Sequence, residues 1–421
     1  MMFLLYSKLK KVFYGWWIVA ASFFIAMCVG GIIFYGFTAF FEPIADDLGW
    51  SYTQISLAAS LRGLEMGLLA PLTGILADRW GPRRLIFSGV VITAVGLIIL
   101  SDATSLGIFF GAFALIAIGM SACTMTVLMT AVANWFRRKI GIASGIAMCG
   151  FGFSGLLLPI IVRLIEVYEW RMAVTILAMG ILVVALPLSL LLRHKPEQYG
   201  HFLDGQVQDP VTHDDGSGLS QAPEAEVKAK QALKSSTFWH LSLAFMYHMM
   251  VVSATITHVM PYLSSIGVAR SMSSLVATAI PLTSIGGRLG LGWLADKLDR
   301  RLVAAGGLTM VGLGLLCFGY VSTGTIWLLV PFLVLFGIGY GGHNALRVSL
   351  VREYFGRTSF GTVFGLIIGV GTLGSIIGPT VAGWVYDNWG SYQAIWLIFA
   401  GLAIAAVISV LTIRPMVDKK G

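Results

Sequence analysis

The stretch Thr278–Arg301, TAIPLTSIGGRLGLGWLADKLDRR, decides how this chain folds. Its first part is an apolar, glycine-rich run that only a membrane helix explains, and it ends in a short charged loop. A near copy, GILADRWGPRR, occupies residues 74–84, with an offset of 218 residues between the two loops. The second copy has Arg288 where the first has Ala70. The chain therefore contains two copies of one fold, and only the second copy has this arginine inside the bilayer.

Composition identifies a polytopic membrane protein. Of the 421 residues, 57% are hydrophobic and 11% are charged, whereas soluble domains average about 25% charged residues. Apolar runs of roughly 20 residues, the length that spans a bilayer, recur along the chain, and lipid requires them to be helical. The predicted spans are 13–40, 52–77, 84–102, 105–135, 140–165, 171–193, 236–265, 273–295, 302–322, 325–351, 360–386 and 391–413. We predict an all-α polytopic membrane protein with twelve transmembrane helices in two six-helix pseudo-symmetric halves.

The chain has a net charge of +8, and the distribution of its basic residues agrees with the predicted topology. Counted from a cytoplasmic N-terminus, 22 of the 28 Lys and Arg residues fall on the cytoplasmic side. The positive-inside rule then places both termini in the cytoplasm, and the basic balance does not indicate a nucleic-acid partner. The four cysteines lie in apolar spans at unrelated spacings, without a metal or redox pattern. We expect no cleavable signal, and the compact loops favour a bacterial inner membrane.

A second duplication supports the two halves. The segments 135–159 and 354–379 each carry an aromatic–basic connector, two glycines four residues apart and a later proline. Two halves of six helices in the same direction are the natural interpretation. We predict an N-terminal six-helix half at 1–193, a cytoplasmic linker at 194–234 and a C-terminal six-helix half at 235–421. The linker is polar, has no apolar face and is expected to be partly disordered.

Charged groups within the predicted helices are the first candidates for function, because a charge at the bilayer centre costs about 2.5–3.5 kcal/mol on insertion scales. Arg62 and Glu65, three residues apart, can neutralise each other; a structural pair, a proton or gating role and an outer-vestibule position are the alternatives. Arg288 lies eight residues before Asp296, roughly 12 Å inside the cytoplasmic boundary. Its guanidinium suits a carboxylate, and the alternative is a standing salt bridge, for which Glu65 is the near-midplane candidate.

Uncharged polar residues extend the candidate site. His248, near mid-depth, can hydrogen-bond a carboxylate and titrates near physiological pH, although a helix–helix hydrogen bond is the alternative. Tyr340 and the shallower Tyr35 can line a cavity. The predicted substrate-binding residues are Arg288, His248, Tyr340, Tyr35 and Asn344. The candidates for proton coupling or gating are Glu65, Arg62, His258 and His343.

The duplicated Gly-x-Leu-Ala-Asp-Arg/Lys loop, the twelve spans and the long central loop resemble the major facilitator superfamily. Within it, Tyr14–Trp17, the connector at 135–145 and the eighth-helix arginine are similar to the monocarboxylate porter and oxalate/formate antiporter group. Tyr14 stands where animal carriers have an acidic residue. Oxalate antiporters pair the eighth-helix arginine with an eleventh-helix lysine, which this chain lacks, and this favours one carboxylate. The first-helix lysine and eighth-helix aspartate of animal carriers are also absent, so another group must carry the proton, or the acid crosses with its proton.

The resemblance also implies a conformational latch, in which each loop aspartate is held by an arginine and by a helix N-terminus. Arg347 is at the right depth to meet Asp296. Asp78, followed by Arg79, is expected to act likewise against the eleventh helix. The latch would stabilise the outward-open state, and packing alone is the alternative.

We predict a secondary active transporter of small organic anions, with proton-coupled monocarboxylate transport (lactate- or pyruvate-like) by alternating access of the two halves. The alternatives are a carboxylate antiporter of the oxalate or formate kind, efflux of a larger amphiphile, and a transport-dead sensor. No nucleophile–base pair, metal cluster or phosphate-binding loop is visible, so we expect neither an enzyme nor a cofactor. The expected partners are the anion, protons and the lipid bilayer, and we expect a monomer to function.

Overall fold

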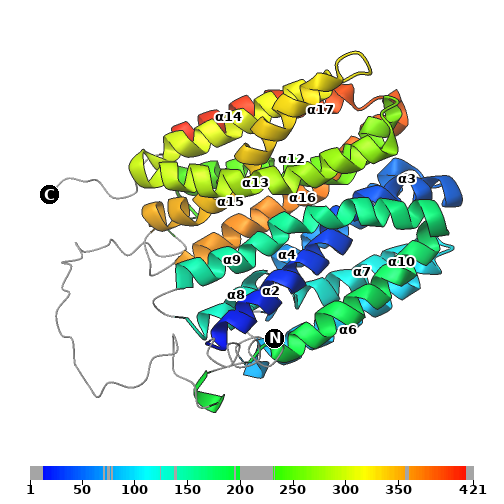
Figure 1. Cartoon of the computed structure of the whole chain (residues 1–421). Helices are drawn as coiled ribbons and strands as arrows, with labels where there is room; N and C mark the ends of the chain where they lie inside the picture. The colour runs from blue at the N-terminus through cyan, green and yellow to red at the C-terminus, as the bar shows by residue number, and fades with distance from the viewer. Residues whose placement is uncertain are drawn as a thin grey trace, which may run out of the picture. The chain divides into compact units, whose positions relative to one another are not determined.

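The computed structural model describes residues 13–69, 72–73, 76, 79–123, 125–136, 140–193, 196–199, 231, 233–355 and 360–413 (Figure 1). Throughout these residues the regular elements are helices, as predicted. Those before residue 200 are α2 (Gly15–Val29), the π-helix η1 (Gly30–Tyr35), α3 (Phe37–Leu48), α4 (Tyr52–Leu68), α6 (Pro82–Ser101), α7 (Leu106–Ser121), α8 (Met125–Ala133), α9 (Ile140–Phe153), η2 (Ser154–Leu157), α10 (Leu158–Leu191) and η3 (Pro196–Tyr199). Those after it are α12 (Ser236–Ser265), α13 (Arg270–Lys297), α14 (Arg300–Gly319), η5 (Ile326–Leu328), α15 (Leu329–Phe355), α16 (Phe360–Trp389) and α17 (Gln393–Leu411).

The described helices match the predicted spans in order. Within the described part of the chain, nine stretches are long and apolar enough to cross a membrane. One of them, Ile142–Leu191, holds two predicted spans, because Glu169 takes a positive φ of 62° and turns the chain between them. The shorter apolar helix α7 and the 17-residue helix α4 account for the remaining two.

The first span is longer than predicted. It continues beyond residue 40 through α3 and ends at Leu48, where Gly49 takes a left-handed backbone with φ 64°. Three acidic residues beyond the predicted end of the span lie on this helix: Glu42, Asp46 and Asp47. The reason is the apolar face of α3, which is buried and keeps the segment helical while the acids occupy the other face.

Contacts divide the chain into two compact units. The first comprises Met1–Gly31, Leu69–Ser154 and Arg171–Leu219, and the second comprises Ile32–Leu68, Gly155–Trp170 and Ser220–Gly421. Parts of the first, second and fifth spans thus belong to the same unit as the C-terminal helices. The division into halves at residues 193 and 235 stays a prediction.

Glycines bring the helices together in the first unit. A Cβ atom on Gly119 of α7 would meet Thr93 of α6, and one on Gly150 of α9 would meet the backbone of Phe23 in α2. Membrane helices approach this closely only through small residues. The high glycine content seen in the sequence therefore serves helix packing here.

Glycines also allow close helix packing in the second unit. Helix α16 packs on α12, where Gly374 and Gly378 approach the carbonyl groups of Met246 and Met250. Helix α14 packs on both α15 and α17, and Figure 1 shows α12, α13, α15 and α16 as neighbouring long helices. This unit carries the polar residues that form the candidate site.

Candidate functional site

Helices α12, α13 and α15 bring together polar side chains that are far apart in the sequence. His248 of α12 and His343 of α15 have ring centroids 4.3 Å apart. The ring of Tyr340 stacks 6.0 Å from that of His248. Phe245 lies against the two imidazoles, at 6.5 Å from His248 and 6.3 Å from His343. These two histidines, Tyr340, Arg288 and Arg347 are called the polar cluster below.

Helical periodicity and close packing align this cluster. Tyr340, His343 and Arg347 follow one another at intervals of three and four residues, so they share one face of α15. Helix α13 meets α15 at backbone distance, because a Cβ atom on Gly341 would meet the carbonyl group of Ser284. This contact brings Arg288, one turn beyond Ser284, close to α15.

Several buried polar atoms of the cluster lack hydrogen bonds. His248 is fully buried, yet neither of its ring nitrogens has a partner among the described residues. Within the same described part, Nδ1 of His343 and Nε of Arg347 also have none. Roughly nine in ten buried polar groups are paired, and an unpaired one costs about 1–3 kcal/mol. A concentration of such atoms in one place indicates a site for a polar ligand.

Tyr35 joins the cluster from the first span. It is the last residue of η1, and π-helical turns frequently occur at functional sites. Its hydroxyl lies 2.9 Å from that of Tyr340. Arg288 interacts electrostatically with both Tyr35 and Arg347. The pair of tyrosine hydroxyls therefore bridges the first span and α15 beside a buried positive charge.

Arg347 lies in the polar cluster. Its guanidinium carbon is 5.2 Å from the ring centroid of Phe245 and 5.9 Å from that of Phe364, within the range of cation–π attraction. The sequence predicts that this arginine pairs with Asp296 in a latch, and this stays a prediction because the Asp296 side chain lies outside the described residues. Among the described side chains, no carboxylate forms an ion pair with Arg347.

Other predicted site residues are only partly described. Arg79 is exposed. The backbone of α4 includes two of them, but their side chains lie outside the described residues: Arg62 and Glu65. Also outside are the Asn344 side chain and all of Asp78. The roles proposed for these residues stay predictions.

His258, on the same helix as His248, is surrounded by hydrogen-bond partners. Its Nδ1 lies 2.9 Å from the Tyr392 hydroxyl, and its Nε2 lies 2.9 Å from the Pro379 carbonyl and 3.0 Å from the Ser56 hydroxyl. A carbonyl group only accepts, so Nε2 carries the hydrogen and Nδ1 accepts from Tyr392.

Asp387 is a connecting residue that sequence reasoning missed. Its carboxylate, near the end of α16, accepts hydrogen bonds from the backbone N–H groups of Tyr52 (3.0 Å) and Thr53 (2.8 Å) and from the Thr53 hydroxyl. It therefore caps the N-terminus of α4, where a negative charge is favourable. No local signal connects residues so distant in the sequence.

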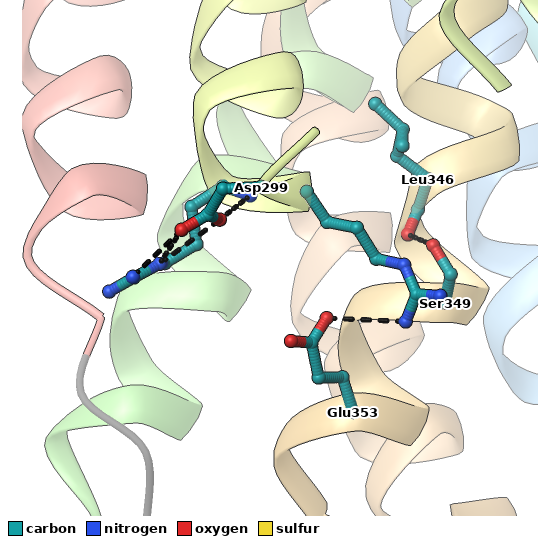
Figure 2. Close-up of polar contacts among 6 residues, drawn as sticks. Asp299, Leu346, Ser349 and Glu353 are labelled. Atoms are coloured by element: carbon teal, nitrogen blue, oxygen red, sulfur yellow. Dashed lines mark hydrogen bonds and ion pairs between the residues drawn. The ribbon is translucent and has the colours of Figure 1, made fainter. Parts of the chain in front are cut away.

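Figure 2 shows the loop after α13 and the nearby end of α15. Asp299 accepts hydrogen bonds from the guanidinium (2.9 Å) and the backbone N–H (2.8 Å) of Arg301, and these bonds, chiefly the side-chain one, lower the pKa of the Asp299 carboxyl group. Glu353 pairs with Arg300 at 3.2 Å. Both pairs are partly exposed to solvent, which screens them, so each contributes little to stability.

The chemistry of the polar cluster suits an oxyanion. Guanidinium groups, imidazole N–H groups and a phenol all donate hydrogen bonds to negatively charged oxygen. In the part of the chain that the structure describes, no three His, Cys, Asp or Glu side chains are grouped to hold a metal ion. The cluster is therefore interpreted as an anion site.

The profile of the Major Facilitator Superfamily matches residues 22–269 and 259–421, so the chain belongs to this superfamily of membrane transporters. Curated relatives include monocarboxylate transporter 12 of Rattus norvegicus, 26% identical over 404 residues that cover 91% of this chain and 82% of the relative. Monocarboxylate transporter 13 of Bos taurus is 25% identical over 419 residues, covering 96% and 89%. The resemblance to the monocarboxylate group is thereby confirmed.

Among solved structures, a bacterial homologue of the human lysosomal transporter Spinster, in an inward-facing and unoccupied conformation, has a TM-score of 0.67 at 16% identity. The match covers 94% of this chain and 95% of that one. At this identity the likeness concerns the fold alone. Together with the helices described above, it confirms the predicted twelve-helix, two-half membrane architecture.

Proposed function

We propose that this protein is a secondary transporter of small organic anions, in the first place monocarboxylates such as lactate or pyruvate. One observation carries the proposal: the imidazoles of His248 and His343 are buried beside Arg347, and both ring nitrogens of His248 and Nδ1 of His343 have no hydrogen-bond partner among the described residues. A carboxylate would satisfy them and compensate a buried positive charge. The monocarboxylate names of the relatives point to the same class.

In the proposed bound state, Arg288 holds the carboxylate through two parallel N–H groups. His248 and His343 donate from the side of α12 and α15, and the Tyr340 hydroxyl turns from Tyr35 toward the anion. Asn344 is proposed as a further donor. Anion binding would thus exchange the Tyr35–Tyr340 hydrogen bond for one to substrate and loosen the connection between the first span and α15.

Proton coupling is proposed to use the histidine pair. Two imidazolium rings at 4.3 Å would repel each other, so the pair accepts one proton, which an adjacent carboxylate stabilises. Glu65, Arg62 and His258 are the other candidates. A transport cycle follows if residues 1–193 rock against residues 235–421, with Asp78 and Asp296 as latch residues. We further propose an inner-membrane monomer with both termini in the cytoplasm.

The test is uptake of radiolabelled L-lactate into proteoliposomes, with and without an inward proton gradient, for the wild type and Arg288→Ala. We expect gradient-stimulated uptake that the substitution abolishes. Uptake that requires an internal anion would change the assignment to exchange. Undiminished uptake by folded Arg288→Ala would contradict the anion-binding role. Absence of uptake by folded wild type would contradict the substrate class.

A further inference from the structure

One carboxylate connects α4 with the last turns of α16. Asp387 accepts hydrogen bonds from the backbone N–H groups of Tyr52 (3.0 Å) and Thr53 (2.8 Å) and from the Thr53 hydroxyl. The first N–H groups of a helix have no acceptor within that helix, and a negative charge at this terminus is favourable. Asp387 therefore supplies, from α16, the acceptor that the start of α4 lacks.

The two helices also approach at backbone distance beside this carboxylate. Gly383 lies one turn before Asp387, and a Cβ atom on it would come within 2.8 Å of the Tyr52 carbonyl oxygen and 2.7 Å of the Ser56 hydroxyl. Small residues permit this close approach of membrane helices. Because an aspartate side chain is short, moving α4 away from α16 at this level would break the hydrogen bonds of Asp387.

Ser60 continues the contact about two turns further along α4. Its hydroxyl donates to the Ile376 carbonyl at 2.9 Å and lies 3.1 Å from the Thr380 hydroxyl, and Ser60 is only 1% exposed. The residue numbers increase along α4 while those of the partners in α16 decrease, so the two helices are antiparallel. Separation of the helices would expose Ser60.

The contact lies at the end of α16 that is remote from the Asp299 loop. Glu353, near the end of α15, pairs with Arg300 beside that loop, and α16 begins only a few residues after α15 ends. Helix α16 therefore starts on the side of the Asp299 loop, and Asp387 lies near its opposite end. With both termini in the cytoplasm, as proposed, this opposite end is the outer one.

Helix α4 belongs to the predicted N-terminal half and α16 to the predicted C-terminal half, so rocking of the halves would separate them here when the site opens outward. We infer that Asp387 is an outer latch: its hydrogen bonds to the start of α4 stabilise the outward-closed state, and outward opening exchanges them for water. The inference rests on the proposed function, in particular on the rocking of the halves. It adds a latch at the end of the helices opposite to the one predicted for Asp78 and Asp296.

The test measures how fast a hydrophilic maleimide labels Ser60→Cys in the purified full-length protein in detergent, where both ends of the helices are accessible. Labelling of the four native cysteines is subtracted with the protein that lacks this substitution. The reporter is combined with Asp387→Ala, Asp387→Asn, Gly383→Ala or Asn388→Ala. Asn388 is the matched control, because its side chain donates to the Trp384 carbonyl of its own helix at 2.8 Å.

We expect Asp387→Ala to raise the labelling rate about 3–10-fold, since the loss of a helix cap has effects of about this size. Asp387→Asn should raise it less, because the amide oxygen still accepts a hydrogen bond. Gly383→Ala should act in the same direction without removing a charge, and Asn388→Ala should leave the rate unchanged. Thr380→Cys, on the facing helix, is a second reporter and should respond in the same way.

Thermal unfolding and lactate uptake separate the possible failures. An unchanged labelling rate in folded Asp387→Ala would overturn the inference, and a lowered thermal midpoint with that result would assign Asp387 to helix stability alone. Equal acceleration by Asn388→Ala would also overturn it, because general loosening of this end would then be the cause. Faster labelling of the Asp387 variants without lactate uptake by the wild type would contradict the substrate class and support the latch.

Discussion

His248 and His258 lie on the same helix, both are fully buried, and they differ in what surrounds them. His258 contacts Tyr392, Pro379 and Ser56 within hydrogen-bond distance. The ring nitrogens of His248 have no partner among the described residues. Burial by itself therefore does not distinguish a structural histidine from a functional one.

The presence or absence of hydrogen-bond partners changes what each histidine contributes to the stability of the protein. A satisfied polar side chain in a membrane protein stabilises it, on average by about 0.6 kcal/mol for each interhelical hydrogen bond. An unsatisfied one costs stability. The unsatisfied ring nitrogens of His248 lower the stability of the protein without substrate. We propose that hydrogen bonds to bound substrate offset this loss. We therefore propose a stabilising role for His258 and a binding role for His248.

The largest effect is expected from His248→Phe, which keeps an aromatic ring and removes the donors. Uptake of the anion should fall about 10–100-fold, the equivalent of losing one hydrogen bond to a charged group. The thermal midpoint in detergent should stay the same or rise, because no described partner is lost. A lowered midpoint with normal uptake would reverse the assignment of His248.

His258→Phe should show the opposite pattern. It removes the partner of the Tyr392 hydroxyl and of the Pro379 carbonyl, so we expect a loss of about 1–3 kcal/mol in stability. Thermal unfolding of the purified protein measures this, and uptake per folded molecule should remain within about threefold of the wild type. A stable variant with abolished proton coupling would instead support the gating role that the sequence suggested.

The hydroxyl bridge allows a finer test. Tyr340→Phe should lower uptake about 3–10-fold, the effect of one neutral hydrogen bond, because it removes a donor to substrate as well as the contact with Tyr35. Tyr35→Phe, the matched variant, removes only the contact and should have the smaller effect. Initial uptake rates for both variants decide the order, and equal effects would mean that only the bridge matters.

The smallest effect, on stability alone, is expected at Asp299, which belongs to a loop and not to the polar cluster. Its pKa is lowered by Arg301, so its contribution to stability is present above the pKa of the unfolded chain and is lost as pH falls through the folded-state pKa. Because the pair is exposed, Asp299→Asn should change stability by only about 0.2–0.5 kcal/mol near neutral pH. Unfolding at pH 7 and at a pH below the folded-state pKa of Asp299 measures the difference, which should disappear at the lower pH. A loss above about 1 kcal/mol would show that the loop contributes more than a surface pair.

The spans could be predicted because apolar length and the repeated loop are local properties of the sequence. The exceptions have local causes that need the folded backbone, such as the turn at Glu169 and the continuation of the first span to Leu48. The sequence also supplied candidate residues for the site, since polar groups are rare in these helices, and their roles stay predictions. Their mutual contacts were not predictable: the guanidinium of Arg347 lies beside the Phe245 ring, and its predicted pairing with Asp296 stays a prediction.

The sequence by itself determined the membrane class, the order of the helices and the identity of the buried charge at Arg288, because hydropathy and internal repetition need no knowledge of contacts. Only the tertiary structure decided which polar atoms are satisfied. His248 and His258 have the same residue type and the same helix. His248 packs against the ring of His343 in α15 and has no hydrogen-bond partner among the described residues, whereas the hydrogen-bond partners of His258 come from α4, α16 and the start of α17. Hydrogen bonding depends on distances between helices, and those distances exist only in the packed protein.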